Sequence, residues 1–153
     1  MAEVKLIAVL GAGLMGHGIT QVAAQIGKYN VYMRDIDQQF VDNGMNMIRG
    51  SLQKFQNKGQ ITEQQMNETL ARIHPTLDLK EAVSNADLII EAVPENIELK
   101  KATFKEVDAY APAHAIIASN TSSVSITELA SATKRSEKIC GMHFFNPPPV
   151  SYT

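Results

Sequence analysis

The sequence predicts an α/β domain built on a doubly wound, mostly parallel sheet. Short and nearly continuous apolar runs, typical of strands buried on both faces, alternate with longer segments of helical periodicity. A glycine-rich motif, residues 11–16, lies between the first apolar run and the first helical segment. The length of 153 residues fits one domain, since domains usually span about 100–200 residues.

The first half of the chain contains two expected strands and three expected helices. Strands over 6–10 and 31–33 flank a helix over 14–26, which ends before Gly27. A long polar helix is expected over 38–58. The sequence Thr62-Glu63-Gln64-Gln65 forms a capping box that begins a third helix. This helix ends before His74-Pro75, so we expect His74 at a helix end.

The second half repeats the alternation. Strands are expected over 88–90 and 115–118, with a charged helix over 97–109 between them. A second capping box, residues 125–128, begins a short helix through Leu129. The last strand is expected over 139–145, and no internal repeat or linker divides the pattern.

The composition argues against several classes of protein. Hydrophobic residues make up 44% of the chain and charged residues 20%, which fits a globular rather than a disordered protein. The net charge of −2 gives no basic excess for nucleic acid or an anionic membrane. The single Cys140 gives no internal disulfide and no cysteine cluster for zinc, so no metal site is expected and a cytoplasmic location is favoured. No apolar run reaches the ~18 residues of a membrane span, and the N-terminus does not read as a signal peptide.

The glycine motif indicates dinucleotide binding. Gly11-Ala12-Gly13-Leu14-Met15-Gly16 matches G-x-G-x-x-G, follows an expected strand and opens an expected helix. In this setting Gly11 permits a tight turn, Gly13 lets the backbone approach a pyrophosphate, and Gly16 lets the helix pack closely on the strand. The helix N-terminus would supply N–H donors to the phosphates.

Asp35 is the expected ribose ligand. It lies 19 residues after Gly16, at the end of the second expected strand, where a carboxylate can bind both ribose hydroxyls. The alternative is an aspartate in an ordinary turn. A carboxylate repels a 2′-phosphate, which favours NAD over NADP, whereas the guanidinium of neighbouring Arg34 could accept one and leaves NADP open.

Two polar segments follow later strands. Residues 119–123 (Ser-Asn-Thr-Ser-Ser) come after an apolar run, and residues 143–147 (His-Phe-Phe-Asn-Pro) end the last expected strand. Ligands of open α/β sheets bind beyond the carboxyl ends of strands, so both segments point to the cofactor crevice. Histidine ordinarily titrates near pH ~6.5 and can accept a hydroxyl proton while a nicotinamide accepts the hydride. A lone histidine is more often structural, but Asn146 and the Ser/Thr segment favour catalysis by His143.

Four motifs occur together along the chain. In order, they are the glycine motif, Glu91-Ala92-Val93-Pro94-Glu95-Asn96, the Ser-Asn-Thr-Ser-Ser segment and the His-Phe-Phe-Asn-Pro segment. The combination resembles the NAD-binding, Rossmann-like domain of the 3-hydroxyacyl-CoA dehydrogenases, and is most similar to the bacterial 3-hydroxybutyryl-CoA type. The resemblance covers residues 4–150. We therefore expect an NAD-binding domain over 1–150 and a truncated end over 151–153.

The resemblance implies an oxidoreductase of fatty acid and short-chain acyl-CoA metabolism. It would interconvert (S)-3-hydroxyacyl-CoA and 3-ketoacyl-CoA by hydride transfer to and from NAD. By resemblance, His143 is the general base in oxidation and the general acid in the reverse direction. Ser122 would hydrogen-bond the substrate oxygen and help to place the nicotinamide, and Asn146 would hold the thioester region and the cofactor.

The resemblance also implies binding positions. Asp35, Glu95 and Lys100 match positions that contact NAD. Ser51 and Lys58 match positions that contact coenzyme A, and an ammonium group is a suitable partner for its phosphates. For both lysines the alternative is a solvated surface residue. An acyl-CoA substrate is the implied partner, without nucleic acid or membrane, and the full-length family implies a homo-oligomer.

The sequence departs from the family pattern at its end. The glutamate that orients the family's histidine would fall beyond Thr153, as would the helical C-terminal domain. We therefore expect a single domain without that helical domain. The alternatives to an enzyme fragment are a non-catalytic NAD-binding module and one half of a two-chain enzyme. A hydroxyacid dehydrogenase with a lysine base shares the glycine motif, but no segment of this sequence replaces that of His143.

Overall fold

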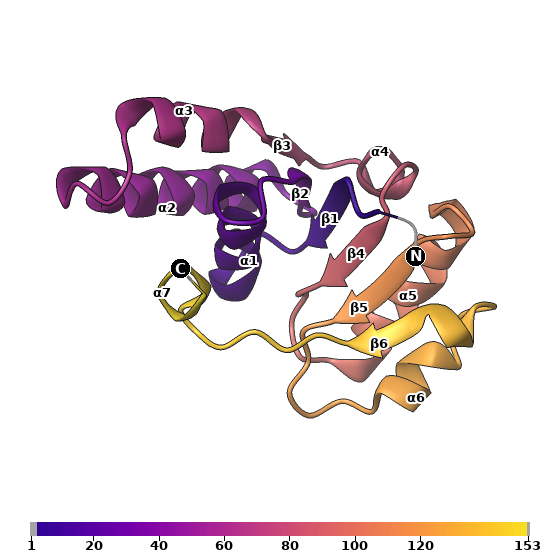
Figure 1. Cartoon of the computed structure of the whole chain (residues 1–153). Coiled ribbons are helices and arrows are strands. Elements are labelled where there is room, and N and C mark those ends of the chain that lie inside the picture. The colour runs from indigo at the N-terminus through magenta and orange to yellow at the C-terminus, as the bar shows by residue number, and fades with distance from the viewer. Residues whose placement is uncertain (1–2, 153) are drawn as a thin grey trace.

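The computed structural model describes residues 3–152 and contains one parallel sheet of six strands in the order β3-β2-β1-β4-β5-β6 (Figure 1). The strands are β1 (Leu6–Leu10), β2 (Asn30–Arg34), β3 (Ile73–Thr76), β4 (Leu88–Glu91), β5 (Ile116–Ser119) and β6 (Ile139–Gly141). The helices are α1 (Leu14–Gln25), α2 (Gln38–Asn57), α3 (Glu63–Ala71), α4 (Leu79–Val83), α5 (Ile97–Tyr110), α6 (Ile126–Ala130) and α7 (Pro148–Ser151), with a 3₁₀ turn η1 (Ser136–Lys138). The strand order reverses between β1 and β4, which confirms the doubly wound, Rossmann-like prediction.

Helices cover both faces of the sheet because the strands carry apolar side chains on both sides. On one face, α1 and α2 bury strand side chains in a core that includes Val9, Ile19, Val31, Met33, Ile48 and Leu52. On the other face, α4, α5 and α6 complete a second core that includes Leu10, Val83, Ile89, Phe104, Ile117 and Leu129. The two cores fix the sheet between the helical layers, so the carboxyl ends of its strands form a rigid edge.

Only one of the two expected capping boxes forms completely. Thr62 Oγ1 accepts from Gln65 N at 3.1 Å, and Gln65 Oε1 accepts from Thr62 N at 2.8 Å. In the second expected capping box, Ser125 Oγ accepts a hydrogen bond from Glu128 N at 3.3 Å. The Glu128 carboxylate instead accepts from Lys101 Nζ at 2.5 Å, so an ion pair between α5 and α6 replaces the return bond.

The structure corrects the expectation for His74. His74 lies in β3 and pairs with Tyr32 of β2, rather than at a helix end. β3 is an edge strand, where the missing N–H of Pro75 is tolerated. The short helix α4, which the sequence pattern did not predict, follows from Asp78, whose Oδ1 accepts from the first amides of the helix.

The last strand is shorter than expected, since β6 ends at Gly141 and not at residue 145. Its neighbour β5 ends at Ser119, and the ladder closes with a bond from Met142 N to Ser119 O at 2.8 Å. His143 therefore lies beyond the strand. The chain then crosses to α1, where α7 packs with Pro148 against Gly18 (Figure 1). Of the expected end over 151–153, Thr153 lies outside the described residues.

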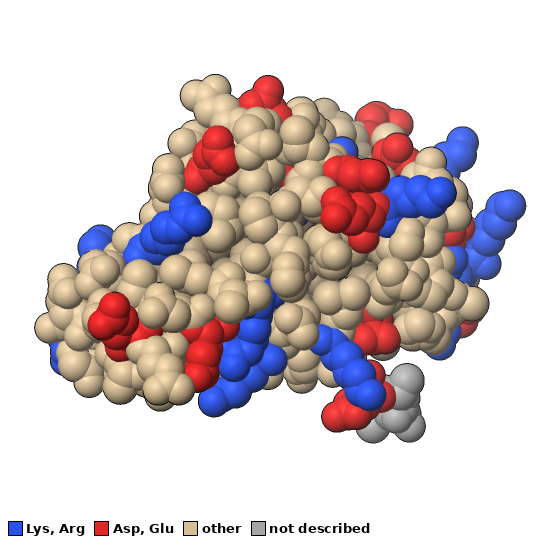
Figure 2. Space-filling view, turned by 90° about the horizontal axis from the view of Figure 1, so that it is seen from above, with Lys and Arg blue, Asp and Glu red and all other residues tan. Residues whose placement is uncertain are grey.

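The surface of the described chain is mixed in charge. On the face that Figure 2 shows, Lys and Arg side chains are interspersed with Asp and Glu. Within residues 3–152 no helix is long and apolar enough to cross a membrane. The same residues contain no group of three or more His, Cys, Asp and Glu side chains that could hold a metal ion.

Candidate functional site

The turn between β1 and α1 depends on two glycines. Gly11 has a φ of +108°, which side-chain-bearing residues rarely adopt. A Cβ on Gly16 would lie 1.8 Å from the carbonyl oxygen of Gly11, so any side chain there would force α1 away from β1. No atom lies within 4 Å of a Cβ built on Gly13, so the space beside this exposed backbone is open to a ligand. This arrangement fits a pyrophosphate at the N-terminus of α1.

Asp35 connects the end of β2 to this turn through a hydrogen bond. Its Oδ2 accepts from Ala12 N and its Oδ1 from Ile36 N, both at 2.7 Å. The neighbouring Arg34 donates from Nε to the carbonyl oxygen of Leu77 at 3.1 Å, which holds it against the loop before α4. A half-buried carboxylate beside the glycine turn fits the ribose hydroxyls of a dinucleotide.

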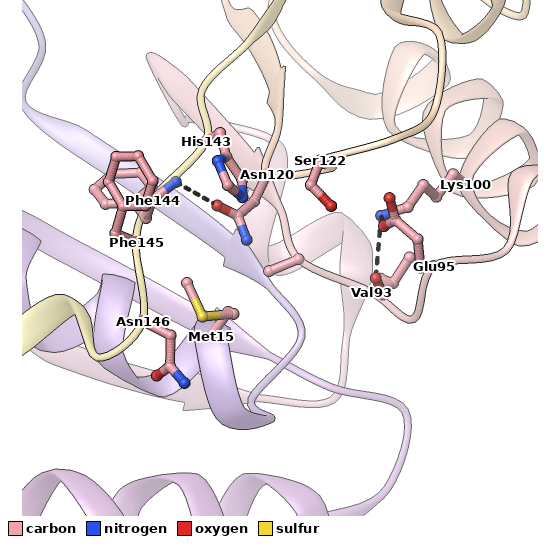
Figure 3. Close-up of a pocket in the computed structure, with 11 residues that line it drawn as sticks. Met15, Val93, Glu95, Lys100, Asn120, Ser122, His143, Phe144, Phe145 and Asn146 are labelled. Carbon is pink, nitrogen blue, oxygen red and sulfur yellow. Dashed lines mark hydrogen bonds and ion pairs between the residues drawn. The ribbon is translucent and has the colours of Figure 1, made fainter.

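A cavity of about 480 Å³ opens at the carboxyl ends of β4, β5 and β6 (Figure 3). We call it the His143 cavity, and it brings together Met15, Glu95, Lys100, Ser122, His143 and Asn146 from the sequence predictions. Ser122, His143 and Asn146 are exposed, and their side chains make no hydrogen bond within residues 3–152. The His143 ring contacts the ring of Phe145, with centroids 5.6 Å apart. The polar atoms of these three side chains are therefore available to a ligand.

Two side chains hold the segment that carries His143. Asn120 Oδ1 accepts from Phe144 N at 2.7 Å, as Figure 3 shows. Tyr152 Oη accepts from Phe145 N at 2.9 Å, and its ring packs against Phe144 with centroids 5.2 Å apart. These acceptors replace the strand partners that the backbone loses beyond β6. They fix the segment next to the cavity.

Lys100 is buried, which overturns the alternative of a solvated surface lysine. Only 1% of its surface is exposed, and its Nζ lies 2.7 Å from Glu91 Oε1. Val93 O lies at 3.1 Å and Glu95 Oε2 at 3.3 Å from the same nitrogen. The Glu91 carboxylate is also fully buried and accepts from Val93 N at 2.7 Å and from Ser119 Oγ at 2.6 Å.

Glu95 lies at the rim of the His143 cavity, where hydroxyl groups surround its carboxylate. Its Oε1 accepts from Thr121 Oγ1 and from Ser123 Oγ, the latter at 2.9 Å. Burial acts to raise the pKa of Glu95, but the hydrogen bonds from Thr121 and Ser123 lower it. The hydrogen bond and positive charge of Lys100 add to this effect, and the pKa falls to about 2. The side chain is therefore an anion at neutral pH.

Ser51 and Lys58 line a second cavity, away from the first, of about 450 Å³ beside α2. We call it the Lys58 cavity, and Lys54, Val150 and His17 also line it. Lys58 is exposed, and within residues 3–152 its ammonium group forms no ion pair. His17 Nδ1 lies 2.7 Å from Gly13 O, so this side chain links the cavity to the glycine turn.

The sequence predictions missed three residues that shape the site: Glu91, Asn120 and Tyr152. A single acidic residue at the end of the apolar run 88–90 was the available signal for Glu91. Asn120 belongs to the predicted Ser-Asn-Thr-Ser-Ser segment, but its bond to the next segment depends on the register of β5 with β6. For Tyr152 the sequence held no signal, since its contacts arise only after the chain turns back at α7.

The parallel sheet has this strand order, a glycine turn at the reversal, and an open cavity into which polar side chains project. Together these features define a dinucleotide-binding domain. The family model described as "3-hydroxyacyl-CoA dehydrogenase, NAD binding domain" matches residues 6–153. The chain belongs to this family, and its cofactor is NAD.

Relatives of known name agree with this assignment. The chain is 43% identical over 148 residues to the probable 3-hydroxybutyryl-CoA dehydrogenase of Bacillus subtilis, covering 97% of this chain and 51% of the relative. It is 46% identical over 145 residues to the fatty acid oxidation complex subunit alpha of Pseudomonas aeruginosa, covering 95% of this chain and 20% of the relative. The chain also superposes on the crystal structure of (S)-3-hydroxybutyryl-CoA dehydrogenase from Ralstonia eutropha with a TM-score of 0.92. The two sequences are 40% identical, and the match covers 97% of this chain and 52% of the other. The chain thus spans about half the length of the Bacillus relative, and a fifth of the Pseudomonas one.

Proposed function

We propose that the chain acts in the NAD-dependent interconversion of (S)-3-hydroxyacyl-CoA and 3-ketoacyl-CoA. The observation that carries this proposal is the convergence of Ser122, His143 and Asn146, all without hydrogen-bond partners in the described chain, on one cavity next to the glycine turn. A site that only bound a dinucleotide would not require a proton acceptor at this place. The names of the Bacillus and Ralstonia relatives support a 3-hydroxyacyl-CoA substrate. We also propose a cytoplasmic location, which the single cysteine favours.

In this proposal, bound NAD supplies the hydride acceptor, and the side chains of the cavity manage the proton. His143 takes the proton of the 3-hydroxyl group during oxidation and returns it in the reverse direction. Ser122 donates a hydrogen bond to the substrate oxygen, where negative charge develops during reduction. Asn146 holds the thioester region and the cofactor. Glycine-turn residues 11–16, Asp35 and Glu95 hold the NAD.

The coenzyme A part of the substrate is proposed to lie in the Lys58 cavity. Lys58 offers an ammonium group without an ion-pair partner among residues 3–152, and Ser51 offers a hydroxyl at the same cavity. Phosphate groups bind such donors through charge-assisted hydrogen bonds.

Replacement of His143 tests the proposed reaction. The purified chain is mixed with acetoacetyl-CoA and NADH, and the loss of NADH is followed by its absorbance. His143→Gln should lower the turnover by about 10²–10⁴-fold, the usual contribution of a general acid or base. His74→Gln is the matched control, since His74 is exposed on the edge strand β3, away from the cavity.

Two results would contradict the proposal. Equal turnover of the two histidine variants would remove His143 from the reaction. NADH binding without any turnover by the wild-type chain would favour an NAD-binding module, or a half that needs a second chain.

Replacement of Lys58 tests the coenzyme A site. Lys58→Ala should raise KM for acetoacetyl-CoA by roughly three- to tenfold, since one charge-assisted contact is lost. The KM for acetoacetyl-pantetheine, which lacks the adenosine phosphates, should stay unchanged. Lys105→Ala, on the opposite face of the sheet in α5, is the control. An equal rise of KM for both substrates would argue against a phosphate contact.

A further inference from the structure

We infer that His17 is a further ligand of the coenzyme A phosphates and that it makes the binding of coenzyme A depend on pH. In its protonated form, the imidazole of His17 joins Lys54 and Lys58 as a third cation at the Lys58 cavity. The inference rests on the proposed function, which puts the coenzyme A part of the substrate in this cavity. Three observations carry it: the hydrogen bond of His17, the charges that line the cavity, and the open space beside Gly50.

The hydrogen bond of His17 to the glycine turn fixes which ring nitrogen carries the proton of the neutral side chain. His17 lies in the first turn of α1, and its Nδ1 is 2.7 Å from the carbonyl oxygen of Gly13. A carbonyl oxygen only accepts, so Nδ1 is the donor and holds the proton. Nε2 then carries a lone pair, and no group within residues 3–152 bonds to it. Since His17 is half-buried and lines the Lys58 cavity, Nε2 is the polar atom that it offers to a ligand.

Protonation reverses what Nε2 offers. In the neutral ring, Nε2 is an acceptor, and an ionised phosphate has only acceptors, so no hydrogen bond forms between them. In the imidazolium, both ring nitrogens donate. Nε2 then donates a charge-assisted hydrogen bond to a phosphate, while Nδ1 keeps its bond to Gly13. The bound phosphate and the proton on Nε2 therefore promote each other, as two linked ligands do.

The charges along the Lys58 cavity are all positive, which suits a ligand with several negative charges. Lys54 and Lys58 lie one helical turn apart at the end of α2, and within residues 3–152 neither ammonium group forms an ion pair. No acidic residue of the described chain lines the cavity, and α1 and α7 carry no Asp, Glu, Lys or Arg. The other charged residues on the elements packed against α1 do not line it either: Arg34, Asp42, Arg49, Glu63 and Glu68.

Gly50 leaves part of the cavity wall without a side chain. Glycine inside a helix is less stable than alanine, so its presence in α2 calls for a physical reason. For Gly44 the reason is packing, since a Cβ there would lie 2.8 Å from the carbonyl oxygen of Ala12. No atom lies within 4 Å of a Cβ built on Gly50, which lines the cavity. Packing within the described chain does not require this glycine, and the open space beside it fits a bound ligand.

The position of His17 favours coenzyme A over NAD as the source of the phosphate. The glycine turn 11–16 offers its backbone N–H groups to a pyrophosphate at the start of α1. His17 meets this turn through Nδ1, which is already bonded, and no residue of the turn lines the cavity that the His17 ring lines. Nε2 therefore meets a phosphate of coenzyme A, and a phosphate of NAD is the alternative that the experiment tests.

Calorimetric binding of free coenzyme A at pH 8 and pH 6 tests the inference without requiring turnover. His17→Asn keeps an N–H donor for Gly13 near the place of Nδ1 and removes Nε2. At pH 8, where histidine is ordinarily neutral, wild type and His17→Asn should bind coenzyme A nearly equally. At pH 6, wild type should bind it about three- to tenfold more tightly. Comparison of the two proteins at each pH cancels the titration of the ligand's own phosphate.

Two controls separate His17 from general effects of pH. His74→Asn, an exposed change on the edge strand β3, should bind coenzyme A like wild type at both pH values. The affinity for NAD⁺ should not differ between wild type and His17→Asn. A difference at pH 6 for NAD⁺ alone would assign the ring to the cofactor and overturn the inference. Equal affinities for coenzyme A at pH 6, or an equal loss in His17→Asn at both pH values, would also overturn it.

Nuclear magnetic resonance of the wild-type chain covers the case in which His17→Asn does not fold. At pH 7, coenzyme A should move the ¹⁵N chemical shift of His17 Nε2 from that of an unprotonated toward that of a protonated nitrogen. NAD⁺ should leave this shift in place. An Nε2 shift that coenzyme A did not change would contradict the inference.

Lys58→Ala distinguishes failure of this inference from failure of the coenzyme A site. If Lys58→Ala weakened coenzyme A binding at both pH values and His17→Asn at neither, the site would stand and the inference would be wrong. If neither substitution changed the affinity, or if the wild-type chain bound no coenzyme A, the coenzyme A site of the proposed function would fail together with the inference.

Discussion

Asp87 joins three segments at the end of the sheet opposite the cavity. Its Oδ2 accepts from Lys5 N at 2.8 Å and Leu6 N at 3.0 Å, and its Oδ1 lies 2.8 Å from His114 Nε2. The backbone N–H groups of Leu6 and Lys5 lower the pKa of this carboxyl against the effect of burial, and His114 adds to the lowering. The ionised carboxylate therefore stabilises the folded chain by fixing the start of β1.

Asp87→Asn should lower the free energy of unfolding at pH 7 by about 1–2 kcal/mol, because charged acceptors are lost. The folded pKa lies below the unfolded one, so the contribution is present above pH ~4 and disappears as the pH falls through the folded pKa. Urea unfolding at pH 7, 5 and 3 should thus show a difference from wild type that shrinks in acid. Glu106→Gln, an exposed change on α5, is the control. A difference that stayed constant with pH would contradict the role of the carboxylate.

At the scale of single residues, sequence reasoning succeeded where the signal is local. The spacing from Gly16 to Asp35 and the motif around His143 led to residues that do line the turn and the cavity. Lys100 shows the limit of prediction from local sequence signals. Lysine is ordinarily exposed, and its burial depends on Glu91, which reaches it only when β4 and α5 pack together.

At the scale of the elements, the segment from His143 to α7 differs from its surroundings, since it follows the last sheet bond, from Met142 N to Ser119 O, and has no sheet partner of its own. Asn120 and Tyr152 side chains supply the acceptors for its amides. The segment is thus held by two hydrogen bonds where a strand would have a continuous ladder. Its order depends on the residues that directly follow β5 and α7 rather than on its own backbone pattern.

Tyr152→Phe removes one of these bonds and keeps the ring packing on Phe144. The amide of Phe145 should then exchange with deuterium about 2–12-fold faster, which corresponds to the loss of one neutral hydrogen bond of about 0.5–1.5 kcal/mol. Nuclear magnetic resonance of the two proteins measures this rate. Tyr110→Phe, an exposed change on α5, should leave it unchanged. An unaltered rate in Tyr152→Phe would show that the tyrosine does not hold the segment.

The elements that sequence reasoning found and missed follow one physical rule. The long helices and the buried strands β1, β2, β4 and β5 have strong apolar patterns, and their predictions were confirmed within a few residues. The edge strand β3, with His74 and Pro75, and the early end of β6 were not predicted. Both depend on the neighbouring strand, which a local pattern does not report.

At the scale of the whole molecule, the reversal of strand order between β1 and β4 divides the site into two halves. The glycine turn and Asp35 lie on one side, and Glu95, Ser122 and His143 lie on the other. The alternation of strands and helices predicted a doubly wound parallel sheet with ligands at the carboxyl ends of its strands, although the sixth strand, the edge strand β3, was not predicted. The Lys58 cavity could not be predicted from that pattern, since α2 and the α7 region form it together.

The bond from Ala12 to Asp35 bears on how coenzyme preference could change in evolution. In the proposed NAD site, the Asp35 carboxylate would repel a 2′-phosphate, and the same carboxylate connects the glycine turn to the end of β2. A substitution that admitted the phosphate would remove this connection in the same step and leave the amide of Ala12 without its acceptor. Arg34, already engaged with Leu77, would also have to be released. A mutational path toward the phosphorylated coenzyme therefore passes through a less stable intermediate unless a compensating residue appears first, and this epistasis tends to preserve the present preference.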